Sequence, residues 1–304
     1  MDMKKILMAD ALDKEAADML KAVPGFEVVQ KTGMDEAELI KTIPGFNAVV
    51  VRSATKLTRK VIEASRGLEL IVRAGIGLDN IDVAAAKEKG VTVANTPAAT
   101  SISVAEHTFG LMLAAVRKHG QANLSMKAHK WEKKLFSGTE LYGKTLGLIG
   151  CGRIGREVAR RALAFGMTVI ASDIVDIRCD LDIAQVSLDE LLSRADIISL
   201  HLPKTEQSKN MIGSAVFAKM KPGAVLVNAA RGGVVDEKAL LEALNTGRIR
   251  AAALDVFEKE PVEDFSLIDH PHVIATPHIG AAAEEGQKRA GLEVARIIKE
   301  KFAA

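Results

Sequence analysis

The sequence predicts an α/β protein built from two parallel-sheet domains. Short apolar runs alternate with amphipathic segments over the first hundred residues, and the same alternation returns from Thr145 onward. This pattern is typical of βαβ units, in which helices cover a parallel sheet. The chain has 304 residues, which is long for one domain and suits two.

The first hundred residues contain five apolar runs of strand length. We expect strands at 6–8, 26–29, 48–51, 68–72 and 91–94. The segments between them have helical spacing of apolar residues, and we expect helices at 13–22, 35–42, 58–65 and 82–89. These elements predict a flavodoxin-like or Rossmann-like sheet.

The alternation breaks at Asn95-Thr96-Pro97, and a long helix is expected over roughly 101–119. Residues 120–142 are polar but contain Trp131 and Tyr142, the one Trp and the one Tyr of the sequence. Two explanations remain open for these aromatic residues. They form a contact between subunits, or they form a small satellite core of their own.

In the second half we expect six strands, at 145–149, 168–172, 197–200, 224–228, 251–255 and 273–275. A final amphipathic helix, 281–301, has no strand to follow and is expected to return to the first domain. The domains are therefore predicted to be 1–98 with 282–304, and 99–281. A ligand cleft is expected between them.

Composition excludes several classes of protein. The net charge of +2 gives no general attraction to nucleic acid or to a membrane surface, and no apolar run reaches the length of a membrane span. Cys151 and Cys179 have no other cysteines or ligand cluster to accompany them, so we expect free thiols, no metal site and a cytoplasmic location.

The segment Gly150-Cys151-Gly152-Arg153-Ile154-Gly155 stands between an apolar strand and a helical segment. In this context Gly150 allows a tight turn, Gly152 allows a pyrophosphate to approach the backbone, and Gly155 allows close packing of the helix. Asp173 ends the next strand, where its carboxylate suits the ribose hydroxyls of NAD and repels the 2′-phosphate of NADP. The alternative is a glycine-rich turn with a solvated aspartate.

Ionisable residues gather after the later strands, and three of them suit hydride transfer from a 2-hydroxy acid. His278 can take the hydroxyl proton near neutral pH, Arg231 can hold the carboxylate, and Glu260 can fix the imidazole tautomer. His201 has two readings, a structural hydrogen bond or a cofactor contact. His107 falls in the long helix and is expected to be a packing or subunit-contact residue.

Six ordered segments of the chain resemble the D-2-hydroxyacid dehydrogenase family. They are 51–55, 73–80, 150–155, 228–233, 254–261 and 276–280. The segment 130–141 resembles the branch of that family that oxidises 3-phospho-D-glycerate to 3-phosphohydroxypyruvate, the first step of serine biosynthesis. The resemblance implies a discontinuous substrate domain, a central NAD-binding Rossmann domain, and homodimers joined through about 98–145.

The resemblance also implies roles for particular residues. Arg231, Glu260 and His278 would be catalytic. The residues expected to contact NAD are Gly150, Gly152, Arg153, Ile154, Gly155, Asp173, His201, Pro203, Thr205, Ala229, Ala230, Arg231, Asp255, His278 and Gly280, with Asp255 at the nicotinamide amide. The residues expected to face the substrate are Arg52, Ser53, Gly75, Ile76, Arg231 and His278, with Arg52 as the candidate for a phosphate.

Two departures from the family pattern bear on function. The sequence ends at Ala304, so we expect no C-terminal regulatory domain and no feedback by serine. Ile76 stands where many relatives carry Thr, which affects the substrate loop. Two rival activities remain: a glyoxylate or hydroxypyruvate reductase on the same scaffold, and an NAD-sensing corepressor-like protein without catalysis.

Overall fold

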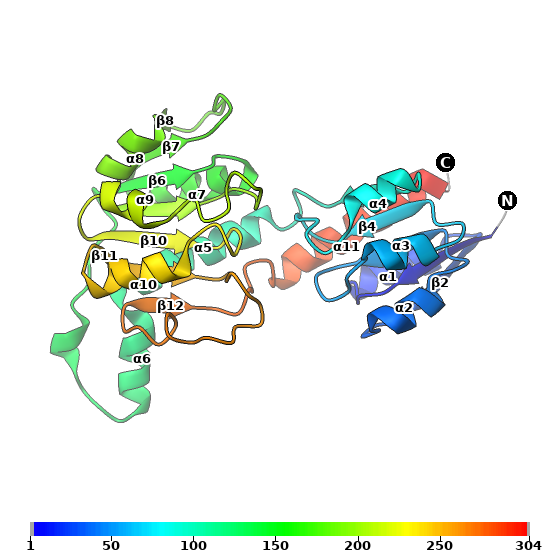
Figure 1. Ribbon diagram of the computed structural model, residues 1–304, viewed down its shortest axis with the longest axis horizontal. Coiled ribbons are helices and arrows are strands. Elements are labelled where there is room, and N and C mark those ends of the chain that lie inside the picture. Colours follow the sequence, from blue (N-terminus) through cyan, green and yellow to red (C-terminus); the bar gives the residue numbers. More distant parts are fainter. Residues whose placement is uncertain (1–2, 303–304) are drawn as a thin grey trace. The chain divides into compact units, whose positions relative to one another are not determined.

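The computed structural model describes residues 3–302, and these divide into two compact α/β units (Figure 1). Unit 1 consists of residues up to Ser101 together with the segment from Ala281, and unit 2 is Ile102–Gly280. The fold class expected from the sequence is confirmed, since each unit contains one parallel sheet. The predicted domain boundaries at 98/99 and 281/282 lie close to this division.

Unit 1 contains a five-stranded parallel sheet. Its strands are β1 (Lys4–Met8), β2 (Phe26–Gln30), β3 (Ala48–Val51), β4 (Leu70–Arg73) and β5 (Thr92–Asn95), in the order β2-β1-β3-β4-β5. All five correspond to predicted strands. The direction of the order reverses between β1 and β3, as in flavodoxin-like sheets, and ligands bind such sheets beyond the carboxyl ends of the strands at that point.

Helices cover both faces of this sheet. Helices α2 (Glu36–Thr42), α3 (Arg59–Ala64) and α4 (Val83–Glu88) contribute to the core on one face, and α1 (Lys14–Lys21) and α11 (Glu284–Phe302) to the core on the other. The predicted return of the last helix is confirmed. Gly291 of α11 packs so closely on α1 that a Cβ there would come within 2.8 Å of the Ala16 methyl group.

Unit 2 contains a seven-stranded parallel sheet. Its strands are β6 (Thr145–Ile149), β7 (Thr168–Ser172), β8 (Ala184–Gln185), β9 (Ile197–Leu200), β10 (Ala224–Asn228), β11 (Ile249–Leu254) and β12 (Val273–Ala275), in the order β12-β11-β10-β9-β6-β7-β8. Six were predicted. Strand β8 was missed because it has two exposed residues and no apolar run. The order reverses between β6 and β9, the Rossmann switch point.

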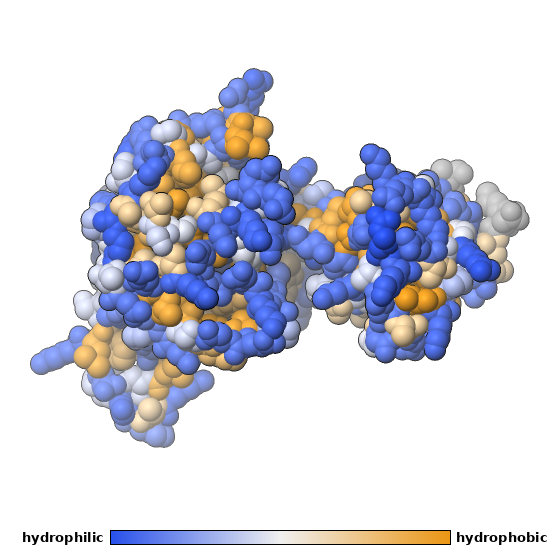
Figure 2. Space-filling view, viewed as in Figure 1, coloured by the Kyte–Doolittle hydropathy of each residue, from blue (hydrophilic) through white to orange (hydrophobic). Residues whose placement is uncertain are grey.

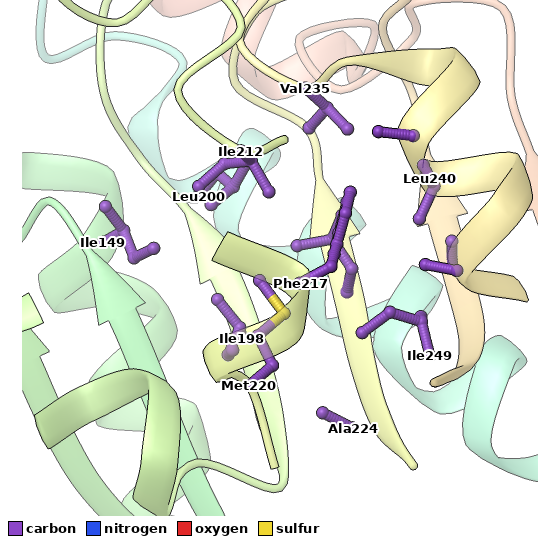
Figure 3. Close-up of a cluster of buried hydrophobic side chains, with 14 of the residues drawn as sticks. Ile149, Ile198, Leu200, Ile212, Phe217, Met220, Ala224, Val235, Leu240 and Ile249 are labelled. Atoms are coloured by element: carbon purple, nitrogen blue, oxygen red, sulfur yellow. The ribbon is translucent and has the colours of Figure 1, made fainter. Parts of the chain in front are cut away.

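Buried strands in this sheet are apolar on both sides because helices cover both faces. In β10, Leu226 points to a core shared with α8 (Leu188–Arg194), α9 (Ser214–Lys219) and α10 (Glu237–Asn245), and Val225 points to a core shared with α5 (Ser101–Arg117) and α7 (Arg153–Ala164). Phe217 of α9 lies among the side chains of the first core, beside Ile198 and Met220 (Figure 3). This packing fixes the strand ends that carry the candidate site.

The helix expected over roughly 101–119 is confirmed, although it ends slightly earlier than expected. Helix α5 stops at Arg117, because Lys118 adopts a left-handed conformation with φ of 56°, and α6 (His119–Lys127) follows. A short 3₁₀ turn, η1 (Lys133–Phe136), comes next. Helix α6 was missed because its sequence has no clear apolar stripe and reads as a polar loop.

Apolar side chains of this segment are exposed. Trp131 is 82% and Tyr142 77% exposed, and Leu124 and Met126 are exposed beside them in sequence. Figure 2 shows hydrophobic residues among hydrophilic ones on the protruding segment around α6. The satellite-core explanation of Trp131 and Tyr142 is therefore wrong within this chain, and the subunit-contact explanation stays a prediction.

The described residues contain neither a helix that could span a membrane nor a cluster of metal-binding side chains. Within residues 3–302, no helix is long and apolar enough to cross a membrane. Nor does that part of the chain bring three or more His, Cys, Asp or Glu side chains together as a metal site would require. Cys151 is buried and Cys179 exposed, and both are free thiols.

Candidate active site

The carboxyl ends of the strands in unit 2 meet at one edge of the sheet, and most predicted site residues lie there. They are Gly150 to Gly155 after β6, Asp173 after β7, His201, Pro203 and Thr205 after β9, Ala229, Ala230 and Arg231 after β10, Asp255 and Glu260 after β11, and His278 and Gly280 after β12. Because parallel strands end together, the topology brings these distant segments to one place.

The amino ends of the strands of the same sheet lie on the opposite side from the candidate site. A cavity of about 90 Å³ lies there, lined by residues including Lys144, Lys221 and Arg250. The Lys221 ammonium pairs with Asp196 at 2.6 Å, and Arg250 donates to the Thr139 hydroxyl. Ligands of open α/β sheets bind at the carboxyl edge, so we place the candidate site there and treat this cavity as solvated surface.

The glycine turn after β6 is shaped as the sequence predicts. Gly150 has a φ of 89°, and a Cβ there would lie 2.4 Å from the carbonyl oxygen of His201. A Cβ on Gly155 would lie 2.7 Å from the Gly150 carbonyl oxygen, whereas the position above Gly152 is open. Helix α7 starts at Arg153, and its N-cap residue Gly152 has no side chain to cap it, so the first amides of the helix are available to a pyrophosphate.

Asp173 supports this turn directly. Its Oδ2 accepts a hydrogen bond from the Cys151 amide at 2.7 Å, and its Oδ1 accepts one from the Val175 amide at 3.2 Å. Each carboxylate oxygen keeps further acceptor capacity for a ribose hydroxyl. The residues present therefore fit NAD: an open glycine turn, an uncapped helix start and an acidic residue at the end of β7.

His201 makes a structural hydrogen bond. Its Nε2 lies 2.9 Å from the Ser199 hydroxyl, and burial lowers the pKa of His201 to about 4. The ring is therefore neutral at neutral pH. Pro203 and Thr205 belong to the turn that follows, which is closed by Ser208, whose hydroxyl donates to the Pro203 carbonyl at 2.7 Å. The structural reading of His201 has this support, while a cofactor contact remains a prediction.

His278 and Glu260 form a pair. The Nδ1 of His278 lies 2.7 Å from the Oε2 of Glu260, and Oε1 of Glu260 accepts from the Phe257 amide at 3.0 Å. The His278 side chain is 50% exposed. Because the ionised carboxylate can only accept, Nδ1 carries the hydrogen and Nε2 is left as the basic nitrogen of the neutral ring.

The electrostatics of the pair follow from this contact. The hydrogen bond to Glu260 raises the pKa of His278 above its ordinary value, although burial and the charge of Arg231 oppose the shift. Burial by itself would raise the pKa of Glu260, but the hydrogen bonds from His278 and from the Phe257 amide outweigh it, so that pKa lies below its ordinary value. The pair thus favours an imidazolium beside a carboxylate.

The loop after β10 holds Arg231. Asn228 closes this loop by accepting from the Ala230 amide at 3.1 Å and donating to the Arg231 carbonyl at 3.1 Å. One Nη of Arg231 donates to the Ala230 carbonyl at 2.7 Å. The next residue must be glycine, because a Cβ on Gly232 would lie 1.7 Å from the Phe257 carbonyl oxygen. The loops of Arg231 and of Glu260 therefore pack against each other.

Asp255 is the most enclosed ionisable residue at this edge, with 1% exposure. Its carboxylate accepts from the Thr276 hydroxyl at 2.6 Å and from the Ile279 and Gly280 amides at 2.9 and 2.8 Å. A fourth partner is His107, whose Nε2 lies 3.2 Å from Oδ1. The contact of Asp255 with a nicotinamide amide stays a prediction.

His107 joins the candidate site although its sequence context did not indicate this. It was expected to pack or to contact a second subunit, but its ring reaches Asp255 from α5. Its spacing from Asp255 of 148 residues gives no local signal. The one available hint is a histidine in an otherwise apolar helix, which is weak by itself.

The predicted substrate residues Arg52, Ser53, Gly75 and Ile76 lie in unit 1, after β3 and β4. The loop after β3 is held by Asp10, a 6% exposed carboxylate that follows β1. Asp10 accepts from the Arg52 amide at 2.5 Å and from the Thr55 amide at 3.2 Å. The Arg52 side chain reaches the Ala11 carbonyl at 3.4 Å.

Comparison with known proteins places the chain in a family. Residues 109–280 match the family model "D-isomer specific 2-hydroxyacid dehydrogenase, NAD binding domain". The chain is 51% identical over 301 residues to the D-3-phosphoglycerate dehydrogenase of Methanocaldococcus jannaschii, covering 98% of this chain and 57% of that protein. It thus spans little more than half the length of this curated relative, and about half the length of several others.

Two further similarities cover whole proteins. The chain is 51% identical over 300 residues to the hydroxypyruvate reductase of Thermotoga maritima, covering 97% of this chain and 98% of that protein. It is similar to the crystal structure of a glyoxylate reductase from Paecilomyes thermophila, with a TM-score of 0.90, 33% identity, and coverage of 99% and 95%. The chain therefore belongs to the D-isomer-specific 2-hydroxyacid dehydrogenases, and residues 109–280 match their NAD-binding domain.

Proposed function

We propose that this protein is an NAD-dependent dehydrogenase that oxidises 3-phospho-D-glycerate to 3-phosphohydroxypyruvate. The observation that carries the proposal is the 2.7 Å contact between His278 Nδ1 and Glu260 Oε2, at the strand edge that also holds Arg231 and the glycine turn. This arrangement provides a base, a group that orients the base, and a cation for a carboxylate.

His278 takes the proton. Its Nε2 accepts the proton of the C2 hydroxyl as the C2–H bond breaks and the C2–O double bond forms. Bound NAD supplies the acceptor for the hydride that leaves C2. Glu260 keeps Nδ1 protonated, so the lone pair stays on Nε2, and its negative charge stabilises the imidazolium that forms.

Two arginines hold the substrate anion. Arg231 binds the carboxylate of the substrate through two parallel N–H donors and polarises the oxygen on C2. Arg52 in unit 1 binds the phosphate, and its loop is already fixed by Asp10. The proposal of Ser53, Gly75 and Ile76 as further substrate contacts rests on the family resemblance alone.

A hydroxypyruvate or glyoxylate reductase is the second candidate. It is favoured by the 51% identity to the hydroxypyruvate reductase of Thermotoga maritima along nearly the whole of both chains. The catalytic pair would be the same, and the reaction would run as reduction, with protonated His278 giving its proton to the forming hydroxyl. What separates the two candidates is whether a phosphate is bound.

A substrate panel tests the choice. Rates are measured for 3-phosphohydroxypyruvate, hydroxypyruvate and glyoxylate, each with NADH and with NADPH. We expect the highest kcat/KM for the phosphorylated acid with NADH. Arg52→Ala should raise KM for the phosphorylated acid and leave the other two unchanged. A preference for hydroxypyruvate that Arg52→Ala does not alter supports the second candidate, and NADH binding without any turnover supports a corepressor-like protein.

We also propose a homodimer joined through about 98–145, and a cytoplasmic location. Leu124, Met126, Trp131 and Leu135 support the dimer, because several large apolar side chains are exposed within this one segment and exposed apolar surface marks association sites. Light scattering on wild type and on Trp131→Glu tests it: the variant should have the mass of one chain. The two free thiols, Cys151 and Cys179, support a reducing compartment.

A further inference from the structure

His278 is presented by a left-handed turn. Its φ is 54°, a conformation that non-glycine residues rarely adopt and that must be held by surrounding contacts. Its own amide donates to the Thr276 carbonyl at 3.0 Å. The next two amides, of Ile279 and Gly280, donate to the two oxygens of Asp255 at 2.9 and 2.8 Å. The buried carboxylate of Asp255 therefore holds the turn through these two amides.

A third contact fixes the carboxylate itself. The Nε2 of His107 lies 3.2 Å from Asp255 Oδ1 and 3.1 Å from the Thr276 hydroxyl oxygen. The Thr276 hydroxyl gives its hydrogen to Asp255 at 2.6 Å, so its oxygen can only accept from His107. Asp255 can likewise only accept. Nε2 of His107 must therefore carry a hydrogen, which it shares between the two oxygens.

His107 brings support from a separate element. Thr276, Ile279 and Gly280 belong to the same loop as His278 and would move with it, whereas His107 lies on α5, a helix whose residues pack in the core of unit 2. Its side chain is 21% exposed, so the hydrogen bonds are only partly open to water. The contact from α5 therefore holds Asp255 in place independently of the loop that contains His278.

We propose that His107 is a positioning residue for His278: through Asp255 and Thr276, its Nε2–H fixes the turn that presents the catalytic ring. The reaction class rests on the proposed function. The contact of His107 with Asp255 and Thr276 does not rest on the proposed function, because it affects the orientation of His278 whichever acid is the substrate. A misplacement of about 1 Å in a reacting group can cost about a hundredfold in rate.

The test compares three variants. His107→Leu removes the donor and keeps the bulk, His107→Gln places an amide N–H near the position of Nε2, and His272→Leu is the control, a change at an exposed histidine before β12. We expect His107→Leu to lower kcat by about tenfold or more, with the Kd for NADH changed less than about twofold. His107→Gln should recover kcat to within about threefold of wild type.

A second measurement needs no substrate. The ring of His278 is titrated by NMR in the free protein, where Glu260, Asp255 and Arg231 are the charged groups that act on it. Loosening the turn should weaken the contact with Glu260, so the pKa of His278 should fall toward its ordinary value in His107→Leu and stay raised in His107→Gln.

The outcomes are separable. An unchanged His278 titration in His107→Leu overturns the inference, as does a Gln variant that behaves like the Leu variant, because then the shared N–H is not the cause. A loss of NADH binding with unchanged kcat also overturns it and assigns His107 to the cofactor. If the wild type reduces none of the 2-keto acids, the proposed function fails, while the titration still decides the role of His107.

Discussion

The two units hold their candidate functional loops in the same way. In unit 1, Asp10 follows β1 and accepts from the Arg52 and Thr55 amides and, at 2.8 Å, from the Thr55 hydroxyl. In unit 2, Asp255 follows β11 and accepts from two amides and from the hydroxyl of Thr276. Each is a buried aspartate that clamps the loop of the neighbouring parallel strand.

The two clamps differ in the strain they contain. No residue of the loop held by Asp10 has a positive φ, and the loop presents a cation suited to binding. The loop held by Asp255 includes His278 at a φ of 54°, and it has the extra contact from His107. We infer that the Arg52 loop, whose proposed role is only to bind, needs its backbone fixed. The His278 loop, which would carry the proposed base, needs the orientation of its side chain fixed as well.

The largest expected effect is at His278. His278→Ala should lower kcat by about a hundredfold or more, because a general base typically contributes this much, while NADH affinity should change far less than kcat. Steady-state rates and fluorescence titration with NADH measure the two quantities. His272→Ala, at an exposed histidine nearby in sequence, is the control. Turnover retained in His278→Ala would remove this residue from the proposed chemistry.

Asp255→Asn should combine a loss of rate with a loss of stability. The amide can accept at one oxygen, but its N–H₂ group faces donors, so at least one amide of the turn loses its partner. We expect a decrease of about 2 kcal/mol in the free energy of unfolding and a tenfold to hundredfold lower kcat. Denaturant unfolding and steady-state rates measure these effects.

The stability difference should depend on pH. Burial alone would raise the pKa of Asp255, but the hydrogen bonds from His107, Thr276 and the two amides outweigh it, so the pKa is lowered. The stabilisation is then complete above the unfolded-state pKa of about 4 and is lost as the pH falls through the folded-state value. The gap between wild type and Asp255→Asn should be widest near pH 7 and narrow in acid. A gap that grows in acid would contradict this assignment.

The fold and the grouping of most candidate site residues could be predicted from the sequence, whereas the contacts of Asp10 and His107 could not. The glycine turn and the residues after each strand follow from local pattern, because parallel strands place their carboxyl ends together. Asp10 and His107 make contacts across 42 and 148 residues, and nothing in their own segments distinguishes them. The chemistry of an imidazole base calls for a carboxylate beside it, but the choice of Glu260, which lies 2.7 Å from His278, rested largely on the family resemblance.

The smaller elements were missed for a related reason. Helix α6 has no apolar stripe, and β8 is only two residues long, so tertiary contacts and not local periodicity define both. The end of α5 depends on one left-handed residue, Lys118, at a position that Gly or Asn usually occupies.

Glu260→Gln should shift a pH profile more than it lowers the maximal rate. Oxidation needs neutral His278, so the rate rises as the pH increases through the pKa of His278. Glu260 raises that pKa, chiefly through its hydrogen bond. Without the carboxylate the pKa falls, so the rise in rate should move to lower pH, and the rate of the reverse reduction should begin to fall at lower pH as well. A profile that does not move would show that Glu260 does not set this pKa.

Asp10→Asn should have the smallest effect, and it tests the difference between the two clamps directly. The change weakens the hydrogen bonds that fix the Arg52 amide but leaves His278 and Glu260 of unit 2 untouched. We expect KM for the phosphorylated acid to rise several-fold, as for a lost contact of about 1 kcal/mol, with kcat nearly unchanged. KM for glyoxylate, which has no phosphate, serves as the internal control. If Asp10→Asn lowers kcat as strongly as Asp255→Asn does, the two clamps are equivalent. The strained turn at His278 would then not explain why His107 supports the clamp of unit 2 while the clamp of unit 1 has no such histidine.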